Sequence, residues 1–170
     1  LERSSESIER FFQQNATHKL REGERVRALK LLELQRHAML MYTSCGWYFD
    51  DLSGIEAIQV LQYAGRALQL AQELFGDGLE ARFLQLLEQA KSNVPAYGDG
   101  RQIYERFVRP AMVDLEKLGA HYAVSSLFEA YPEQVAIYCH RAERDDYHSY
   151  VAGRTKLVIG RARVSCTITG

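Results

Sequence analysis

Apolar residues recur every three or four positions from Ser4 to about Lys91, which is the spacing of one face of an α-helix. The clearest stretch follows Ser53, where a continuous apolar stripe faces a separate polar side. The pattern predicts a helix with a buried face that ends at Gly76. The stripe consists of Ala57, Val60, Leu61, Ala64, Ala67, Leu68, Ala71, Leu74 and Phe75.

Three helix starts are indicated by capping-box pairs, in which a short polar residue is followed three positions later by Glu or Gln. The cap is worth about 0.5–2 kcal/mol where it forms. The pairs are Ser53 with Glu56, Asp77 with Glu80, and Asp99 with Gln102. After the third pair, helical spacing continues to about Ala130, and Pro110 should kink or split that helix because it removes a backbone donor.

The helix before the Trp-containing stretch changes character along its length. From Glu24 to about Gln35 it is amphipathic, whereas "HAMLMYTSCGWYF" is apolar almost all the way round. We expect the second part to enter the interior of the protein.

After Pro132 the pattern changes to the two-residue alternation of β-strands. The alternation slips at Gly160-Arg161, which predicts a β-bulge, and the "RDD" and "AGRT" segments supply turn residues. We therefore predict a mainly α, α+β fold. A bundle of about four to five helices should occupy residues 1–131, and a short antiparallel β portion should occupy residues 132–170.

The composition of the chain has no extreme feature. The 170 residues carry a formal net charge of −1, with acids and bases interspersed, so we expect neither a nucleic acid nor a membrane as partner. No apolar run approaches the roughly 18 residues of a membrane span, and no signal peptide is visible, which predicts a cytoplasmic protein.

Cys45, Cys139 and Cys166 are odd in number and far apart in the sequence. This spacing indicates neither a disulfide framework nor a zinc motif, so we expect reduced, buried thiols, no metal and no cofactor.

Both ends of the sequence resemble cut ends. The chain begins Leu1-Glu2 without Met, and it stops at "SCTITG" while strand alternation continues. We expect a fragment of a larger protein.

The first candidate site is "CGWYFDDLSGIE", which we call the aromatic loop (Cys45–Glu56). Trp47, Tyr48 and Phe49 offer flat apolar faces that could stack on a sugar or heterocycle, while Asp50 and Asp51 could accept hydrogen bonds from hydroxyls. The alternative is structural: the aromatics fill the core, and the acids interact with a helix dipole. Adjacent Asp residues do not suit a glycosidase acid and nucleophile, whose carboxyls face each other about 5–9.5 Å apart.

Three further groups have both a functional and a structural interpretation. A polar stripe could bind a polyhydroxylated ligand or simply face solvent. Two His and a Cys of the predicted strands could approach a metal or be ordinary strand residues. Cys45 could be a nucleophile with a His base or a packed thiol. The polar stripe consists of Gln59, Gln62, Arg66 and Gln69 with Tyr63 and Glu56. The possible metal ligands are Cys139, His140 and His148, and the possible base for Cys45 is His37 or His121.

Three stretches of the sequence resemble a known protein family. They are "RHAMLMYTSCGWYFDDLSGIEAIQVLQYAGRALQLA", "VAIYCHRAERDDYHSYVAG" and "TKLVIGRARVSCTITG". The chain resembles the domain of unknown function that lies C-terminal to the catalytic barrel in bacterial proteins related to glycoside hydrolase family 57, most densely from Arg36 to Ala71. The resemblance implies a parent hydrolase or glucanotransferase with an N-terminal distorted (β/α) barrel. That barrel would act on α-linked glucans or similar saccharides by a retaining mechanism. Its nucleophilic Glu and acid/base Asp would lie outside this sequence.

In that family a helical domain leans over the mouth of the barrel and contributes aromatic and acidic residues. "SCGWYFDD" is similar to a Ser-Asp-Trp-Phe-Trp-type motif, with Cys45-Gly46 where the acid would be. The resemblance implies that the barrel and an α-glucan or oligosaccharide are partners, and that this chain alone has no turnover. We expect no catalytic residue here and these saccharide-binding residues: Trp47, Tyr48, Asp50, Asp51 and Glu56.

A different class of function fits the same sequence. The chain could be a non-catalytic helical module that docks onto another domain or chain and contacts no sugar. Such a module should expose a contiguous apolar patch and be indifferent to saccharides.

Overall fold

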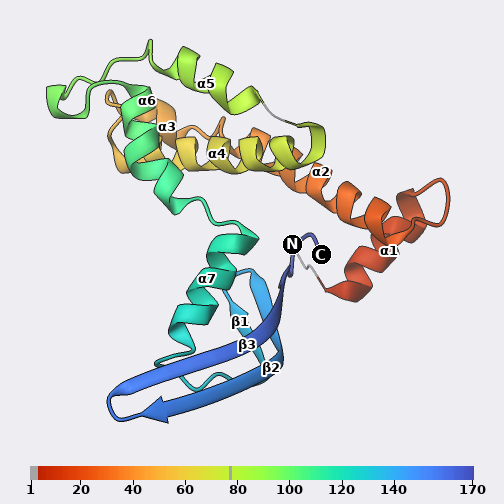
Figure 1. Cartoon of the computed structure of the whole chain (residues 1–170). Coiled ribbons are helices and arrows are strands. Elements are labelled where there is room, and N and C mark those ends of the chain that lie inside the picture. The colour runs from red at the N-terminus through yellow and green to blue at the C-terminus, as the bar shows by residue number, and fades with distance from the viewer. Residues whose placement is uncertain (1–3, 77) are drawn as a thin grey trace. The chain divides into compact units, whose positions relative to one another are not determined.

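The computed structural model describes residues 4–76 and 78–170, and its fold is mainly helical with one antiparallel sheet (Figure 1). This confirms the predicted α+β class. The chain divides into two compact units. The helical unit is Leu20–Met112, and the sheet unit joins the N-terminal segment up to Lys19 with Val113–Gly170. In this division the helix before the sheet, Leu115–Ser125, groups with the sheet.

The helical unit is built around α4, which is the longest helix (Ile55–Phe75). In Figure 1, α2 runs alongside α4, and the two helices are joined by an ion pair of 2.7 Å between Lys30 Nζ and Glu73 Oε2. The remaining elements are α2 (Glu22–Leu40), α3 (Cys45–Tyr48), α5 (Leu79–Leu87), η1 (Pro95–Tyr97), α6 (Gly100–Ile103), η2 (Tyr104–Val108) and η3 (Arg109–Ala111).

The core of the helical unit lies between α4, α5 and the α6–η2 segment. Its buried side chains are Leu61, Leu84, Ile103, Tyr104 and Val108. Gly65 allows the close approach of η2 to α4, since a Cβ at that position would lie 2.9 Å from Val108 Cγ1. The fully buried Leu70 lies outside the predicted apolar stripe of α4, while the predicted stripe residue Phe75 is 62% exposed. The helix is therefore buried on more than one side, because α2 contacts it as well as η2.

The prediction that the end of α2 enters the interior is wrong. None of the residues of α2 is buried, and Met39 and Tyr42 are 67% and 70% exposed. The apolar stretch instead forms a surface. Periodicity cannot distinguish an apolar surface from a core, because both have the same residue pattern.

The capping predictions have different outcomes. Asp99 caps α6 by accepting a hydrogen bond of 3.0 Å from the backbone N–H of Gln102, as predicted. Ser53 does not cap α4, which begins after Gly54 without a side-chain cap. Asp77 lies outside the described residues, and the residue that precedes α5 is Gly78.

Pro110 divides the predicted helix as expected. The helical path runs through α6, the π-helical η2 and the 3₁₀ turn η3, and then becomes extended at Met112 before a new helix starts. Proline has no backbone N–H to continue the helical ladder, which explains the break.

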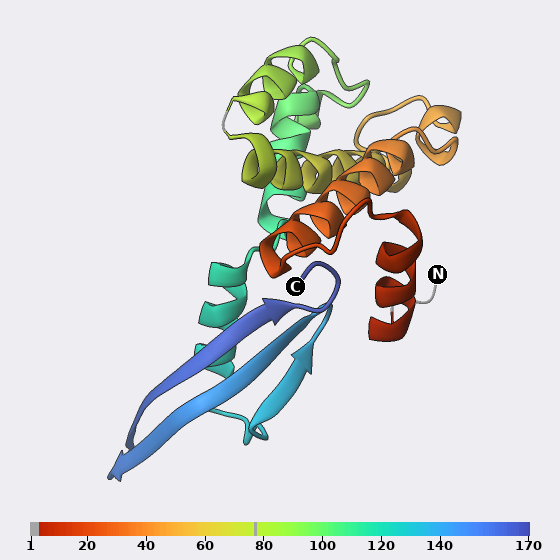
Figure 2. The same cartoon turned by 90° about the vertical axis from the view of Figure 1, so that its right-hand side faces the viewer.

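The sheet unit consists of α1 (Ser5–Asn15), α7 (Leu115–Ser125) and a three-stranded antiparallel meander in the order β1-β2-β3. The strands are β1 (Gln134–Ile137), β2 (His140–Ala152) and β3 (Thr155–Cys166). Figure 2 shows the long β2–β3 hairpin, with α7 beside β3.

The strand boundaries correct the sequence prediction in two places. "RDD" is not a turn: Asp145 is the extra residue of a bulge inside β2, opposite Arg161-Ala162, which accounts for the predicted phase slip at Gly160-Arg161. A turn that was not predicted lies at Tyr138-Cys139 and joins β1 to β2. The "AGRT" turn is confirmed, with Gly153 at a positive φ of 60°.

Among the helices that the structure describes, none combines the length and apolar character needed to cross a membrane.

Candidate functional site

The aromatic loop is an exposed part of the helical unit. Its three aromatic side chains lie in and just after α3, and they are 74% (Trp47), 87% (Tyr48) and 55% (Phe49) exposed. The short α3 approaches α4 closely at Gly46, where a Cβ would lie 2.7 Å from Val60 Cγ2. The loop is thus held against α4 through its backbone while its aromatic rings point outward. The structural alternative, in which these aromatics fill the core, is wrong.

Asp51 holds the second half of the loop in place. One carboxylate oxygen accepts hydrogen bonds from the hydroxyl and the backbone N–H of Ser53, the latter at 2.8 Å. The other accepts from the Ser92 hydroxyl at 2.9 Å and from the Asn93 N–H at 2.7 Å. Four bonds occupy the acceptor positions of a carboxylate. We therefore assign Asp51 to positioning the loop against the Ser92-Asn93 segment.

These hydrogen bonds also change the acidity of Asp51. The hydrogen bond from the Ser53 hydroxyl is the largest cause that holds the pKa of Asp51 well below its ordinary value. The backbone N–H groups of Ser53 and Asn93 and the hydroxyl of Ser92 lower this pKa further. Hydrogen bonds to the ionised form stabilise that form. Because the pKa is lower in the folded state, this stabilisation is present above the unfolded pKa of about 3.9 and is lost as the pH falls through the folded pKa.

Replacing Asp51 with Ala should destabilise the helical unit at pH 7 and flatten the loss of stability below about pH 4, because the variant lacks the group that must be protonated. Urea unfolding followed by circular dichroism between pH 7 and pH 2 measures both effects. Asp50→Ala is the matched control, because the side chain of Asp50 is exposed. The hydrogen bond that the Asn93 side chain donates to Asp50 ends on the backbone oxygen of Asp50, so the substitution leaves its acceptor in place. An Asp51→Ala variant as stable as Asp50→Ala at pH 7 would contradict this role.

The other predicted loop residues lie as follows. Asp50 is exposed, and it directly follows the three exposed aromatic residues in the sequence. Glu56 is half-buried in the first turn of α4, where a negative charge interacts favourably with the helix dipole. In the polar stripe Gln59 is exposed, whereas Gln62, Arg66 and Gln69 are half-buried, and Arg66 donates to Gln69 Oε1 at 3.2 Å. The stripe is therefore only partly open to a ligand.

The cysteine predictions are partly wrong. Cys166 is buried, but Cys45 and Cys139 are exposed. His148 is eight residues from His140 along β2, on the order of 25 Å at the rise of a strand, and its Nε2 lies 3.0 Å from Asp146 Oδ1. The structure brings Cys166 to Cys139 and His140 instead. The sequence could not select this partner, because it depends on the register between β2 and β3.

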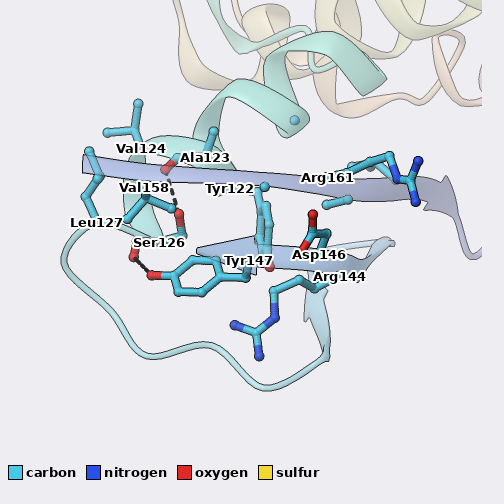
Figure 3. Close-up of a pocket in the computed structure, with 14 residues that line it drawn as sticks. Tyr122, Ala123, Val124, Ser126, Leu127, Arg144, Asp146, Tyr147, Val158 and Arg161 are labelled. Atoms are coloured by element: carbon cyan, nitrogen blue, oxygen red, sulfur yellow. Dashed lines mark hydrogen bonds between the residues drawn. The ribbon is translucent and has the colours of Figure 1, made fainter. Parts of the chain in front are cut away.

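A cavity that the sequence did not predict lies between α7 and the β2–β3 hairpin (Figure 3). Its volume is about 430 Å³. Tyr147 forms part of the wall and donates a hydrogen bond of 3.2 Å to the backbone oxygen of Ser126, while the Arg144 guanidinium lies 4.8 Å from the centroid of its ring. Figure 3 shows Arg161, Asp146 and Arg144 toward one end of the cavity and aliphatic residues toward the other.

The fold and these surfaces define a mixed α+β domain with an exposed aromatic loop. Comparison with protein families then gives a specific assignment: the chain matches the domain of unknown function DUF3536 over residues 1–170, and it belongs to that family. Neither the curated proteins nor the solved structures include one that matches it.

Proposed function

We propose that this domain is the accessory C-terminal part of a cytoplasmic bacterial glycoside hydrolase or glucanotransferase related to family 57. It packs on the catalytic barrel of the parent chain, and the aromatic loop lines the saccharide cleft. The observation that carries the proposal is the exposure of Trp47 and Tyr48, at 74% and 87%, on a loop with a fixed backbone. Large aromatic side chains are usually buried, and rigid exposed rings provide stacking faces for sugars.

Each residue of the loop has a specific role in this proposal. Trp47 and Tyr48 stack on the saccharide, and the exposed Asp50 accepts hydrogen bonds from its hydroxyls. Glu56 is the last residue of the loop and lies in the first turn of α4. Asp51 does not need to contact the ligand, because its hydrogen bonds to Ser53, Ser92 and Asn93 support the loop. Catalysis remains with the carboxylates of the barrel, and the domain alone has no turnover.

The proposal can be tested with Trp47 itself, which is the only Trp of the chain. Adding maltooligosaccharides should change the fluorescence of Trp47 in a saturable way. Tyr48→Ala keeps this reporter and should weaken binding about tenfold, equivalent to about 1.4 kcal/mol, because it removes one stacking face. Phe128→Ala removes an aromatic that is 82% exposed in the sheet unit, and it should leave binding unchanged.

Docking without sugar contact is the second candidate function. It is supported by exposed apolar residues before and within the aromatic loop: Met39 and Tyr42, which precede it, are 67% and 70% exposed, and Ile55 within it is 78% exposed. Where exposed apolar groups form a contiguous patch, they mark an interaction surface. The test uses the separately purified barrel and its complex with this domain. Docking is the function, and the saccharide proposal fails, if three results are found together: the barrel binds this domain, saccharides do not change the fluorescence of Trp47 in the complex, and Tyr48→Ala weakens only binding to the barrel.

A further inference from the structure

Three sulfur and nitrogen ligands meet at one end of the sheet. Cys139 lies in the turn between β1 and β2, His140 is the first residue of β2, and Cys166 is the last residue of β3. The Sγ atoms and a ring nitrogen of these side chains all lie within 4.8 Å of one another. Two strand ends and one turn therefore place three groups typical of a zinc site at one point.

The backbone around these three residues is fixed. His140 and Cys166 are a directly opposite pair in the β2–β3 register. The backbone oxygen of Cys139 accepts hydrogen bonds from the N–H and the hydroxyl of Thr167, both at 2.9 Å, which ties the turn to the end of β3. Tyr138, which precedes Cys139, has a φ of 54°, an uncommon conformation for a residue other than glycine. Strained backbone of this kind is concentrated at functional sites.

The distances match those of a tetrahedral zinc site. Zn–S bonds of about 2.3 Å and Zn–N bonds of about 2.0–2.1 Å place a sulfur and a nitrogen ligand about 3.6 Å apart. Cys139 Sγ and His140 Nδ1 are already 3.5 Å apart. Two sulfur ligands need about 3.8 Å by the same geometry, and the 4.8 Å limit on all separations leaves only a small adjustment for Cys166.

We propose that Cys139, His140 and Cys166 bind one Zn²⁺ ion, with water or a group from another molecule as fourth ligand. Two thiolates and a neutral imidazole balance the charge of the ion, and both thiol protons leave when it binds. His140 and Cys166 are each 8% exposed, whereas Cys139 is exposed, so the site opens to solvent at Cys139. Three protein ligands with one open position is the arrangement of catalytic rather than structural zinc sites. This inference is independent of the saccharide proposal.

The test is a titration of the purified, reduced protein with Zn²⁺ in competition with a chromophoric chelator, together with absorption spectra after Co²⁺ addition. We expect one Zn²⁺ per chain, and thiolate charge-transfer bands with tetrahedral d–d bands for Co²⁺. Cys139→Ser should weaken zinc binding at least about tenfold, because it removes a metal–thiolate bond. This substitution lies in an exposed turn, so the sheet should still form, as circular dichroism can verify.

Two matched controls separate this site from unspecific binding. Cys45→Ser removes the other exposed thiol of the chain, and His148→Ala removes a second histidine of β2; both should keep the affinity of the unmodified protein. Two results would overturn the proposal. The first is no zinc binding by the reduced protein, including the case in which Cys139 and Cys166 form a disulfide on oxidation instead. The second is zinc binding that Cys139→Ser leaves unchanged.

Discussion

Replacing Ile103 with Ala should lower the free energy of unfolding of the helical unit by about 2–5 kcal/mol. Ile103 is 0% exposed and lies in the core with Leu61, Leu84, Tyr104 and Val108. The substitution removes buried apolar surface and leaves a cavity, and both effects destabilise the folded state. Ile103→Val, which removes a single methylene, should cost about 0.5–1.5 kcal/mol.

Urea unfolding followed by circular dichroism measures this effect, and amide hydrogen exchange in α4 assigns it to the helical unit. Leu86→Ala is the control, because Leu86 is 60% exposed on α5 and its truncation should change stability by no more than about 0.5 kcal/mol. If Ile103→Ala and Leu86→Ala were equally stable, the core would not lie between α4, α5 and the α6–η2 segment.

Replacing Gly160 with Ala should destabilise the sheet unit by about 1–3 kcal/mol. A Cβ on Gly160 would lie 2.5 Å from the backbone oxygen of Asp146, across the β2–β3 pair beside the bulge. A backbone oxygen in a strand ladder cannot rotate away as a side chain can, so the strands must separate locally. Faster amide exchange in β2 and β3, together with a lower unfolding midpoint, is the expected result.

Gly119→Ala is the matched control for Gly160→Ala, because both glycines line the cavity of Figure 3. A Cβ on Gly119 would meet nothing within 4 Å, and this residue lies inside α7. Alanine should therefore stabilise α7 by about 0.5–1 kcal/mol. An unchanged or slower exchange in the hairpin of Gly160→Ala would show that the close approach to Asp146 does not constrain the sheet.

Features that depend on a few neighbouring residues could be predicted from the sequence. Pro110 breaks its helix, Gly76 ends α4 with a φ of 94°, and Asp99 caps α6. Each outcome follows from covalent geometry or from a hydrogen bond that spans three residues, so distant parts of the chain do not alter it.

Ser53 and the end of α2 show where local reasoning was insufficient. Ser53 was predicted to cap α4, but Asp51 is two residues away and competes for its hydroxyl. Asp51 in turn is fixed by Ser92 and Asn93, which are about forty positions later and reach the loop only after α4 and α5 have folded back. The apolar end of α2 was predicted to be buried, yet Met39 and Tyr42 are 67% and 70% exposed within the described part of the chain.

The sequence by itself determined the α+β class, the helix breaks and the concentration of aromatic and acidic residues between Cys45 and Glu56, because propensity, periodicity and capping act over a few residues. Only the tertiary structure decided that the aromatics face outward, that Asp51 is a positioning residue, and that Cys166 rather than His148 meets Cys139 and His140. These outcomes depend on strand register and on contacts between distant segments. The energies of such contacts are absent from any short stretch of sequence, because they arise only when the segments pack together.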